Sequence, residues 1–304
     1  MNKNSVKINR KMAYLFQIKL DSTSKEEVLR NIRVNLRDFE KKEIGSKKLF
    51  IVTPNPEQIL LGQKDRVFTK IINSATFSLP DGIGLLQAIK YLNLKDNKKN
   101  PLRFLVLLFQ GIKVGISTFY NKKWLEEDIN LIHGRDMMID IVRLANNKGW
   151  KVVFLGGKGD VAKKCAENLK KNYKNAKFLG LTGPMLNDEA KPISQEDRIL
   201  EMQIIKEINI FAPHIVFVGF GAPKQEKWVY KWLTTLNIGG AMVVGGALDY
   251  IAGKVKVPPE WITRIELEWL WRLFSQKGRV RRILTAFPVF PLKVFLYKLR
   301  NRNI

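Results

Sequence analysis

An apolar strand pattern runs directly into a glycine-rich turn and a helix start in Val216-Phe217-Val218-Gly219-Phe220-Gly221-Ala222-Pro223-Lys224-Gln225-Glu226. Gly219 and Gly221 allow a backbone to approach a ligand closely, and Pro223 suits the first turn of a helix, where its missing N–H is not needed. Free N–H groups at such a helix start attract anions, and Lys224 and Gln225 add polar side chains. The stretch predicts an anion-binding turn, with a tight strand-to-helix connection as the alternative.

Four other apolar runs end in the same abrupt way, with polar residues or glycines after the run. Residues 49–52 precede Thr53 and Asn55, and residues 75–79 precede Asp81, Gly82 and Gly84; residues 151–155 precede Gly156 and Gly157, and residues 241–244 precede Gly245, Gly246 and Asp249. In open α/β sheets, ligands bind at the carboxyl ends of the strands. We therefore expect these five strand ends to form one binding edge.

Helical patterns alternate with the strand patterns, at residues 24–39, 56–73, 136–148, 160–173, 195–211 and 223–236. This alternation predicts an α/β core over residues 13–255, with a mostly parallel, Rossmann-like sheet flanked by helices. Gly156 and Gly157 lack the third glycine of a dinucleotide fingerprint, so a nicotinamide cofactor is disfavoured.

The composition indicates a cytoplasmic protein with anionic partners. The chain has 304 residues and a net charge of +25, which suits nucleic acid, acidic lipid headgroups or diphosphate-bearing substrates. Its single cysteine, Cys165, allows no internal disulfide, and the basic residues 1–11 lack the apolar stretch of a signal peptide.

Two segments depart from a plain α/β core. Residues 94–128 form an apolar and basic insertion, whose apolar run is too short and too interrupted for a transmembrane helix. An interfacial segment and a buried helical hairpin both fit it. Residues 256–304 form an appendage in which residues 269–304 hold nine Lys and Arg and no acid. Because this tail is so aliphatic and aromatic, we expect it to bind an anionic membrane and not nucleic acid.

The ordered motifs Thr53-x-Asn55-x-Glu57, Asp81-Gly82-x-Gly84, Gly219-x-Gly221-x-Pro223-x-Gln225-Glu226 and Gly245-Gly246-x-x-Asp249 resemble the WecG/TagA/CpsF glycosyltransferase family. Leu267-Glu268-Trp269-Leu270 matches a further family motif in the appendage. The resemblance implies an inverting transferase of the N-acetylmannosaminyltransferase type. Such an enzyme moves a sugar from a UDP-sugar to a polyprenyl-diphosphate-linked saccharide during cell-wall or surface-polysaccharide synthesis, as a peripheral protein on the inner face of the cell membrane. The family often self-associates, so a homo-oligomer is also expected.

The resemblance also implies residue roles. Asp81 is the general base, Thr53 and Asn55 line the donor pocket, and Gln225 contacts the reacting groups. A helix cap is the alternative role for Asp81, and turn formation is the alternative for Thr53 and Asn55. The expected substrate-binding residues are Gly82, Gly84, Gly156, Gly157, Gly219, Gly221, Pro223, Lys224, Glu226, Gly245, Gly246, Asp249, Arg272, Arg279 and Arg282.

The leaving diphosphate must be stabilised without an Asp-x-Asp metal motif, because the sequence has none and holds only two histidines. We therefore expect metal-independent catalysis without a cofactor, with Arg272, Arg279 and Arg282 over the leaving group; lipid headgroups are the alternative ligands of these arginines. An Arg-Val-x-Gly-x-Asp family pattern appears as 131–136 without its first arginine, and an Arg-Ala-Pro pattern before a tryptophan appears as 257–261 without its arginine. Arg135 and Arg264 are the candidates to replace these lost arginines. An epimerase-like nucleotide-sugar enzyme and a non-catalytic basic membrane-binding protein are the alternative functions.

Overall fold

The computed structural model describes residues 12–42, 47–264, 267–268, 270–271 and 285–300. Within them a six-stranded sheet has the order β4-β3-β8-β7-β5-β6, and all five strand pairs are parallel. Its strands are β3 (Leu49–Val52), β4 (Phe77–Ser78), β5 (Lys151–Gly156), β6 (Lys177–Leu181), β7 (Ile215–Gly219) and β8 (Gly240–Val243). The predicted fold class, a mostly parallel sheet flanked by helices, is confirmed.

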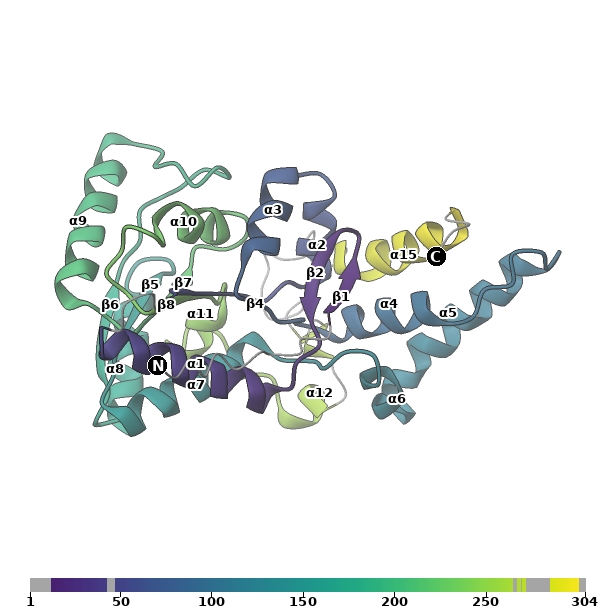
Figure 1. The fold of residues 1–304 in the computed structure, drawn as a ribbon, viewed down its shortest axis with the longest axis horizontal. Coiled ribbons are helices and arrows are strands. Elements are labelled where there is room, and N and C mark those ends of the chain that lie inside the picture. Colours follow the sequence, from purple (N-terminus) through teal and green to yellow (C-terminus); the bar gives the residue numbers. More distant parts are fainter. Residues whose placement is uncertain (1–11, 43–46, 265–266, 269, 272–284, 301–304) are drawn as a thin grey trace, which may run out of the picture.

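Helices cover both faces of the sheet (Figure 1). One face is covered by α1 (Lys25–Glu40), α7 (Gly134–Lys148), α8 (Val161–Asn172) and the short α11 (Ala247–Ile251). The other is covered by α2 (Pro56–Gly62), α3 (Arg66–Ser74), α9 (Gln195–Phe211) and α10 (Lys224–Trp232). The single helix predicted over residues 56–73 is wrong, because Asp65 starts a new helix: its side chain accepts a hydrogen bond from the Phe68 N–H at 2.9 Å.

Alternate residues of each strand supply the two hydrophobic layers. In β7, Val216 and Val218 belong to the layer beneath α9 and α10, whereas Ile215 and Phe217 belong to the layer beneath α7 and α8. Strands that are apolar on both faces are expected where helices cover both sides of a parallel sheet. This explains why the sequence shows continuous apolar runs here instead of an alternating pattern.

The order of the strands reverses beside β5. From β5 the chain crosses to β6 on one side and then returns through α9 to β7 on the other side. Such a reversal opens a crevice outside the carboxyl ends of the two central strands, and ligands bind there in open α/β sheets. Gly156, which ends β5, and Gly219, which ends β7, pair in register at this point.

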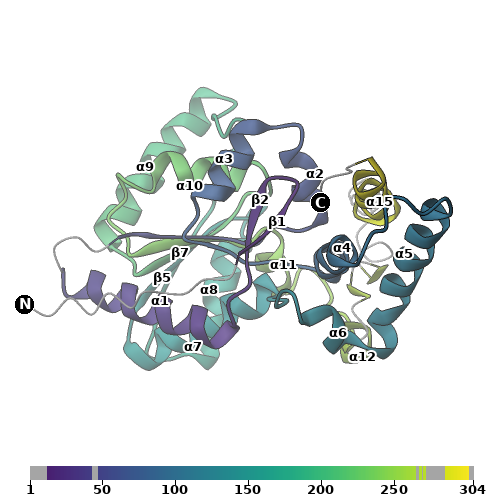
Figure 2. The same cartoon turned by 45° about the vertical axis from the view of Figure 1, so that its right-hand side comes forward.

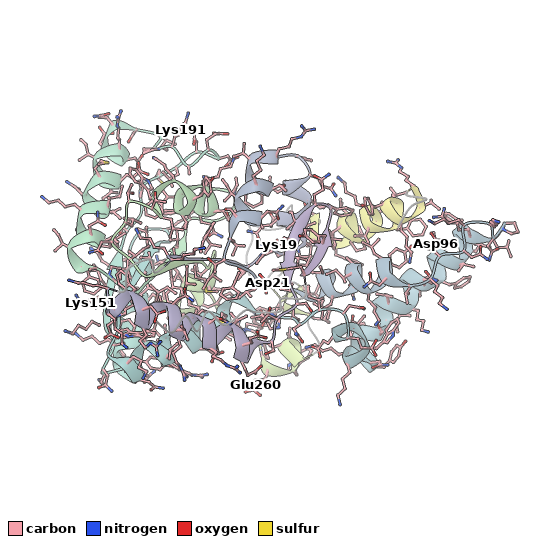
Figure 3. All side chains as sticks on the ribbon, viewed as in Figure 1. Lys19, Asp21, Asp96, Lys151, Lys191 and Glu260 are labelled. Carbon is pink, nitrogen blue, oxygen red and sulfur yellow. The ribbon has the colours of Figure 1, made fainter. Side chains whose placement is uncertain are left out.

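A two-stranded hairpin, β1 (Met12–Leu15) with β2 (Ile18–Asp21), lies beside the β4 end of the sheet. Asp21 at its end is fully buried and accepts a hydrogen bond from the Ser78 N–H at 2.6 Å. Figure 3 shows Asp21 near the middle of the molecule. The sequence patterns that predict the main sheet miss this hairpin and also β6.

A helical group projects from one end of the α/β body (Figure 2). It consists of α4 (Ile83–Asn93), α5 (Arg103–Tyr120), α6 (Lys122–Glu126) and α15 (Phe290–Arg300), which follows the irregular turn η1 (Thr285–Val289); α12 (Glu260–Arg264) lies nearby. The buried Lys298 amine donates to the carbonyl oxygens of Tyr91 and Leu94, and Arg103 donates to those of Lys298 and Leu299. These bonds fix α15 against α4 and α5.

The apolar run within residues 94–128 is not interrupted, and most of the helix that it forms is not buried. Gln110, Gly111 and Lys113 lie inside one continuous 18-residue helix, α5. By length and composition alone α5 is the one helix in the described part of the chain that could cross a membrane, and only 17% of it is buried. The boundaries of the core, the insertion and the appendage stay predictions.

Candidate functional site

The polar strand ends meet at one edge of the sheet. Lys151, at the amino end of β5, lies at the far end of the molecule from Asp96 in the helical group (Figure 3). The carboxyl ends of the parallel strands therefore point toward the helical group. The Asp81 N–H donates to the Pro54 carbonyl at 2.9 Å, and the Ile132 N–H donates to the Pro80 carbonyl at 3.1 Å. These bonds hold the turns after β3 and β4 against the segment that enters α7.

Asp81 lies three residues beyond β4, with 35% of its side chain exposed. It does not cap α4, because the N-cap of that helix is Gly82, at φ +102°, and the helix begins at Ile83. Its Oδ1 atom lies 3.5 Å from Nδ1 of His133, the residue at the N-cap of α7. The carboxylate thus combines solvent access with a neighbouring imidazole that can orient it. A general base needs such access to an incoming hydroxyl.

Asn55 and Thr53 have structural contacts. The Asn55 side chain accepts from the Gln58 N–H, and the Gln58 side chain accepts from the Asn55 N–H, both at 3.0 Å. This capping box fixes the first turn of α2, so Asn55 has the structural role that was the alternative to donor binding. The Thr53 side chain packs against the α-carbon side of Gly134, where an added Cβ would lie 3.1 Å from it. Their contact with a sugar donor stays a prediction.

Gln225 joins two turns of the edge. Its Oε1 atom accepts from the Gly221 N–H after β7 and from the Gly245 N–H after β8, both at 3.1 Å. Its Nε2 atom donates to Oε1 of Glu226 at 2.9 Å, and Gln58 Nε2 donates to the same oxygen at 2.8 Å. Gln225 is 4% exposed and Glu226 is fully buried. Gln225 and Glu226 therefore hold the turns after β7 and β8 together from a buried position. Direct contact of either side chain with substrate stays a prediction.

The glycines bring three strand ends together. A Cβ on Gly156 would lie 3.0 Å from the backbone of Gly219, and one on Gly219 would lie 2.9 Å from the Gly245 oxygen. Gly157, at φ +74°, donates its N–H to the Gly219 carbonyl at 3.1 Å. Gly221, at φ +81°, has no heavy atom within 4 Å of its Cβ position, so open space lies beside this turn. At the strand reversal, the turns after β5, β7 and β8 therefore approach one another closely through their backbones.

The remaining predicted residues of the edge start two helices. Pro223 is the N-cap of α10 and Lys224 is its first residue, whereas Gly246 is the N-cap of α11 and Asp249 lies in its first turn. Gly84 lies in the first turn of α4 and packs near Pro56. Two helix N-termini therefore flank the glycine turns and favour an anionic group there.

Arg135 links this edge to the appendage. Its guanidinium donates to the Glu268 carboxylate at 3.0 Å and lies 5.6 Å from the centre of the Tyr250 ring. Glu268 also accepts from the Thr263 hydroxyl at 3.2 Å. Both charged side chains are largely buried, at 20% and 16% exposed. The family motif of the appendage thus binds the start of α7 next to His133. Arg272, Arg279 and Arg282 lie outside the described residues.

We expect Glu268→Ala to lower the free energy of unfolding by about 1–3 kcal/mol, because a largely buried guanidinium loses its acceptor. Turnover should fall too, since the appendage is tied to the site through Arg135. Thermal unfolding and steady-state turnover measure both effects, with the exposed Glu207→Ala on α9 as the matched control. If Glu268→Ala left stability and turnover unchanged, Glu268 would not support the candidate site.

Sequence reasoning missed His133 as the neighbour of Asp81, and also Gln58 and Glu268 as anchors. A glutamine three residues after Asn55 is a capping-box signal that could have been found. The contacts of His133 and Glu268 join distant parts of the chain, so no local pattern gives them. No group of three or more metal-ligating side chains is present among the residues that the structure describes.

Comparison with known proteins identifies similar glycosyltransferases and a matching family. The chain is 27% identical to an N-acetylglucosaminyldiphosphoundecaprenol N-acetyl-beta-D-mannosaminyltransferase of Bacillus subtilis (strain 168), over 80% of this chain and 78% of the relative. It is 26% identical to a protein of the same name from Staphylococcus aureus (strain MW2), over 91% and 89%. The sequence model of the glycosyl transferase WecG/TagA/CpsF family matches residues 13–120 and 112–304, two pieces that overlap within α5. With its motifs gathered at one edge of a parallel sheet, the chain belongs to the WecG/TagA/CpsF family and is a glycosyltransferase.

Proposed function

We propose that this enzyme transfers N-acetylmannosamine, or a related hexose, from a UDP-sugar to a polyprenyl-diphosphate-linked N-acetylglucosamine, with inversion and without a metal ion. The reaction serves cell-wall polymer synthesis at the cytoplasmic membrane face. The relatives' names support the sugar and the acceptor. The observation that carries the proposal is the partly exposed Asp81 carboxylate, held beside α7 at the same sheet edge as the glycine turns.

In the proposed step, an acceptor hydroxyl attacks the anomeric carbon of the donor. The hydroxyl proton passes to Asp81, a new C–O bond forms, and the bond from the anomeric carbon to the diphosphate oxygen breaks, so that UDP leaves. His133 orients the Asp81 carboxylate through the 3.5 Å contact between Nδ1 and Oδ1. A base held in place for this proton contributes a rate factor of about 10²–10⁴.

The leaving UDP carries negative charge that the edge can stabilise. The positive end of α10 and the Lys224 ammonium are proposed to stabilise this charge beside Gly219 and Gly221. Arg272, Arg279 and Arg282 are proposed to supply further charge from the appendage, which Glu268 ties to Arg135 next to the base.

Inversion is supported by stereochemistry. The relatives' names specify a beta-linked mannosaminyl product. UDP-sugars of this kind are α-linked, so a β product requires inversion in one displacement. A single displacement needs one base and no protein nucleophile, and the partly exposed Asp81 carboxylate can serve as that base.

We expect full turnover in excess EDTA. Lysines, arginines and helix N-termini can offset the charge of the diphosphate, and the described residues hold no carboxylate cluster for a divalent ion. Initial rates of UDP release with EDTA, and with added Mn²⁺ or Mg²⁺, measure this. Loss of activity in EDTA that either metal restores would contradict the metal-free proposal.

A donor panel tests the function. UDP-N-acetylmannosamine, UDP-N-acetylglucosamine and UDP-glucose are each incubated with a short-chain polyprenyl-diphosphate N-acetylglucosamine acceptor, and UDP release is measured. The proposal expects acceptor-dependent release, fastest with UDP-N-acetylmannosamine. Interconversion of the sugars without acceptor would favour an epimerase, and donor or lipid binding without turnover would favour a non-catalytic protein.

A further inference from the structure

The open face of α5 is apolar, and its packed face is the more polar one. Arg103, Leu107, Gln110, Val114 and Ser117 recur at spacings of three and four residues, so they share one helix face. Arg103 pairs with Asp96 at 2.8 Å and Gln110 donates to the Lys95 carbonyl at 2.8 Å, while Leu107, Val114 and Ser117 are buried. This face holds α5 against the rest of the helical group.

The opposite face of α5 is exposed. Nine of the 24 exposed large apolar side chains in the described chain lie on this one helix, among them Phe104, Phe109, Ile112, Ile116 and Phe119. Phe109 is 66% exposed. Contiguous apolar surface of this kind is uncommon on soluble proteins and marks an interaction site. Leu292 on the adjoining α15 is exposed as well, and Figure 2 shows α5 on the outer side of the group.

Basic residues surround this face. Lys98 and Lys99 precede the helix, the exposed Lys113 lies at its border, and Lys122 and Lys123 follow it. Cations at both ends of an apolar helix face match the headgroups and acyl chains of an anionic bilayer. A protein partner or a second copy would have to offer an equally apolar surface ringed by acids, and this basic chain carries 53 Lys and Arg against 28 Asp and Glu.

We propose that α5 is an in-plane membrane helix, which inserts its Phe104–Phe119 face into the headgroup boundary of an anionic bilayer. The packed face argues against a spanning orientation, because Arg103, Gln110 and the buried residues between them bind α5 along its length to α4 and α15. This surface is additional to the predicted membrane-binding appendage.

The position of α5 gives the inference a consequence for catalysis, which rests on the proposed function. α4 begins two residues after Asp81 and packs along α5. Its 11 residues span about 16 Å. A bilayer at α5 therefore places a lipid-linked acceptor within about one short helix of the base.

Vesicle flotation tests the docking. The triple variant Phe109→Glu, Ile112→Glu, Ile116→Glu is compared with Ile199→Glu, Met202→Glu, Ile210→Glu, which adds the same charge at exposed apolar positions of α9. On vesicles of phosphatidylglycerol and phosphatidylcholine, the α5 triple should bind about tenfold or more weakly than the α9 triple, because three inserted side chains are lost. Equal binding by the two triples would overturn the proposal.

Two further readouts separate other outcomes. Both triple variants should keep the turnover of the unmodified protein on a soluble acceptor analogue. If the unmodified protein itself showed no turnover, the proposed function would be wrong, and the docking proposal would not be affected. Sedimentation velocity without lipid identifies self-association. If the α5 triple turned a dimer into a monomer while vesicle binding stayed intact, the α5 face would be covered by a second copy and the proposal would be wrong.

Site-specific labels measure the orientation. Cys165 is the single native cysteine, and burial raises the pKa of its thiol to about 12, so added exposed cysteines react selectively. A fluorophore on Leu105→Cys, Ile112→Cys or Phe119→Cys is quenched by lipids that carry quenchers at shallow or deep positions. An in-plane helix predicts the same shallow depth at all three. A deep centre between shallow ends would show a spanning helix and contradict the proposal.

Discussion

Asp81→Asn is expected to lower turnover by about 10²-fold or more while leaving folding and UDP binding nearly unchanged. The asparagine amide has almost the shape of the carboxylate but cannot take the proton of the acceptor hydroxyl. The side chain is partly exposed and caps no helix, so its replacement removes little structural support. Steady-state turnover, thermal unfolding and UDP titration measure the three quantities.

Asp188→Asn is the matched control, because Asp188 is exposed in the segment between β6 and α9. It should keep full turnover. Asp81→Asn with near-normal turnover would eliminate Asp81 as the base. Equal losses of turnover and of UDP affinity would instead assign Asp81 to donor binding.

Gln225→Leu should produce the largest combined loss of stability and activity. It removes the acceptor of the Gly221 and Gly245 N–H groups and one donor to the buried Glu226. Each unsatisfied N–H costs about 1–3 kcal/mol, so the loss of both acceptors should lower the free energy of unfolding by about 2–6 kcal/mol. The turns after β7 and β8 would then lose their link, and donor affinity should fall with them. Chemical denaturation and UDP titration measure these losses.

Two comparisons make this prediction specific. Gln203→Leu makes the same substitution at an exposed position of α9 and should change neither quantity. Gln225→Glu keeps an acceptor for both N–H groups but places two carboxylates together at the Glu226 contact. It should therefore regain stability as the pH falls and one carboxyl takes up a proton. If Gln225→Leu matched the Gln203→Leu control, Gln225 would not hold the edge together.

The main sheet was predictable because its signals are local. Strands such as β7 are apolar on both faces and end at glycines, and helices such as α9 follow capping residues. The hairpin β1–β2 and the edge strand β6 escaped, since each mixes charged or exposed residues, such as Tyr14, Lys19 and Lys177, with apolar ones. Their place depends on tertiary contacts, such as Asp21 with Ser78.

The candidate site was predictable in position but not in detail. Parallel strands bring their carboxyl ends to one edge, so the motifs after β3, β4, β7 and β8 had to converge. Which side chains face a ligand depends on packing. Glu226 was expected to bind substrate, and its side chain is fully buried and bonded to Gln58 and Gln225.

In the segment 94–128, too, the sequence did not show which side chains are covered by packing. Its composition left an interfacial helix and a buried hairpin equally open, because hydrophobicity alone does not say which face is covered. The structure shows that Arg103 anchors the more polar face of α5 to α15 and that Phe109 and Phe119 are exposed, which excludes a buried hairpin; the interfacial role stays a prediction.

Product analysis tests the central claim most directly, namely that this edge catalyses inverting transfer to a lipid-linked acceptor. The enzyme is incubated with UDP-N-acetylmannosamine and a short-chain polyprenyl-diphosphate N-acetylglucosamine, and the product is examined by mass spectrometry and by NMR of the new anomeric centre. The account predicts a single β-linked disaccharide on the diphosphate lipid, formed in equal amount to the UDP released and lost with Asp81→Asn. An α-linked product, or UDP release without any disaccharide, would contradict it.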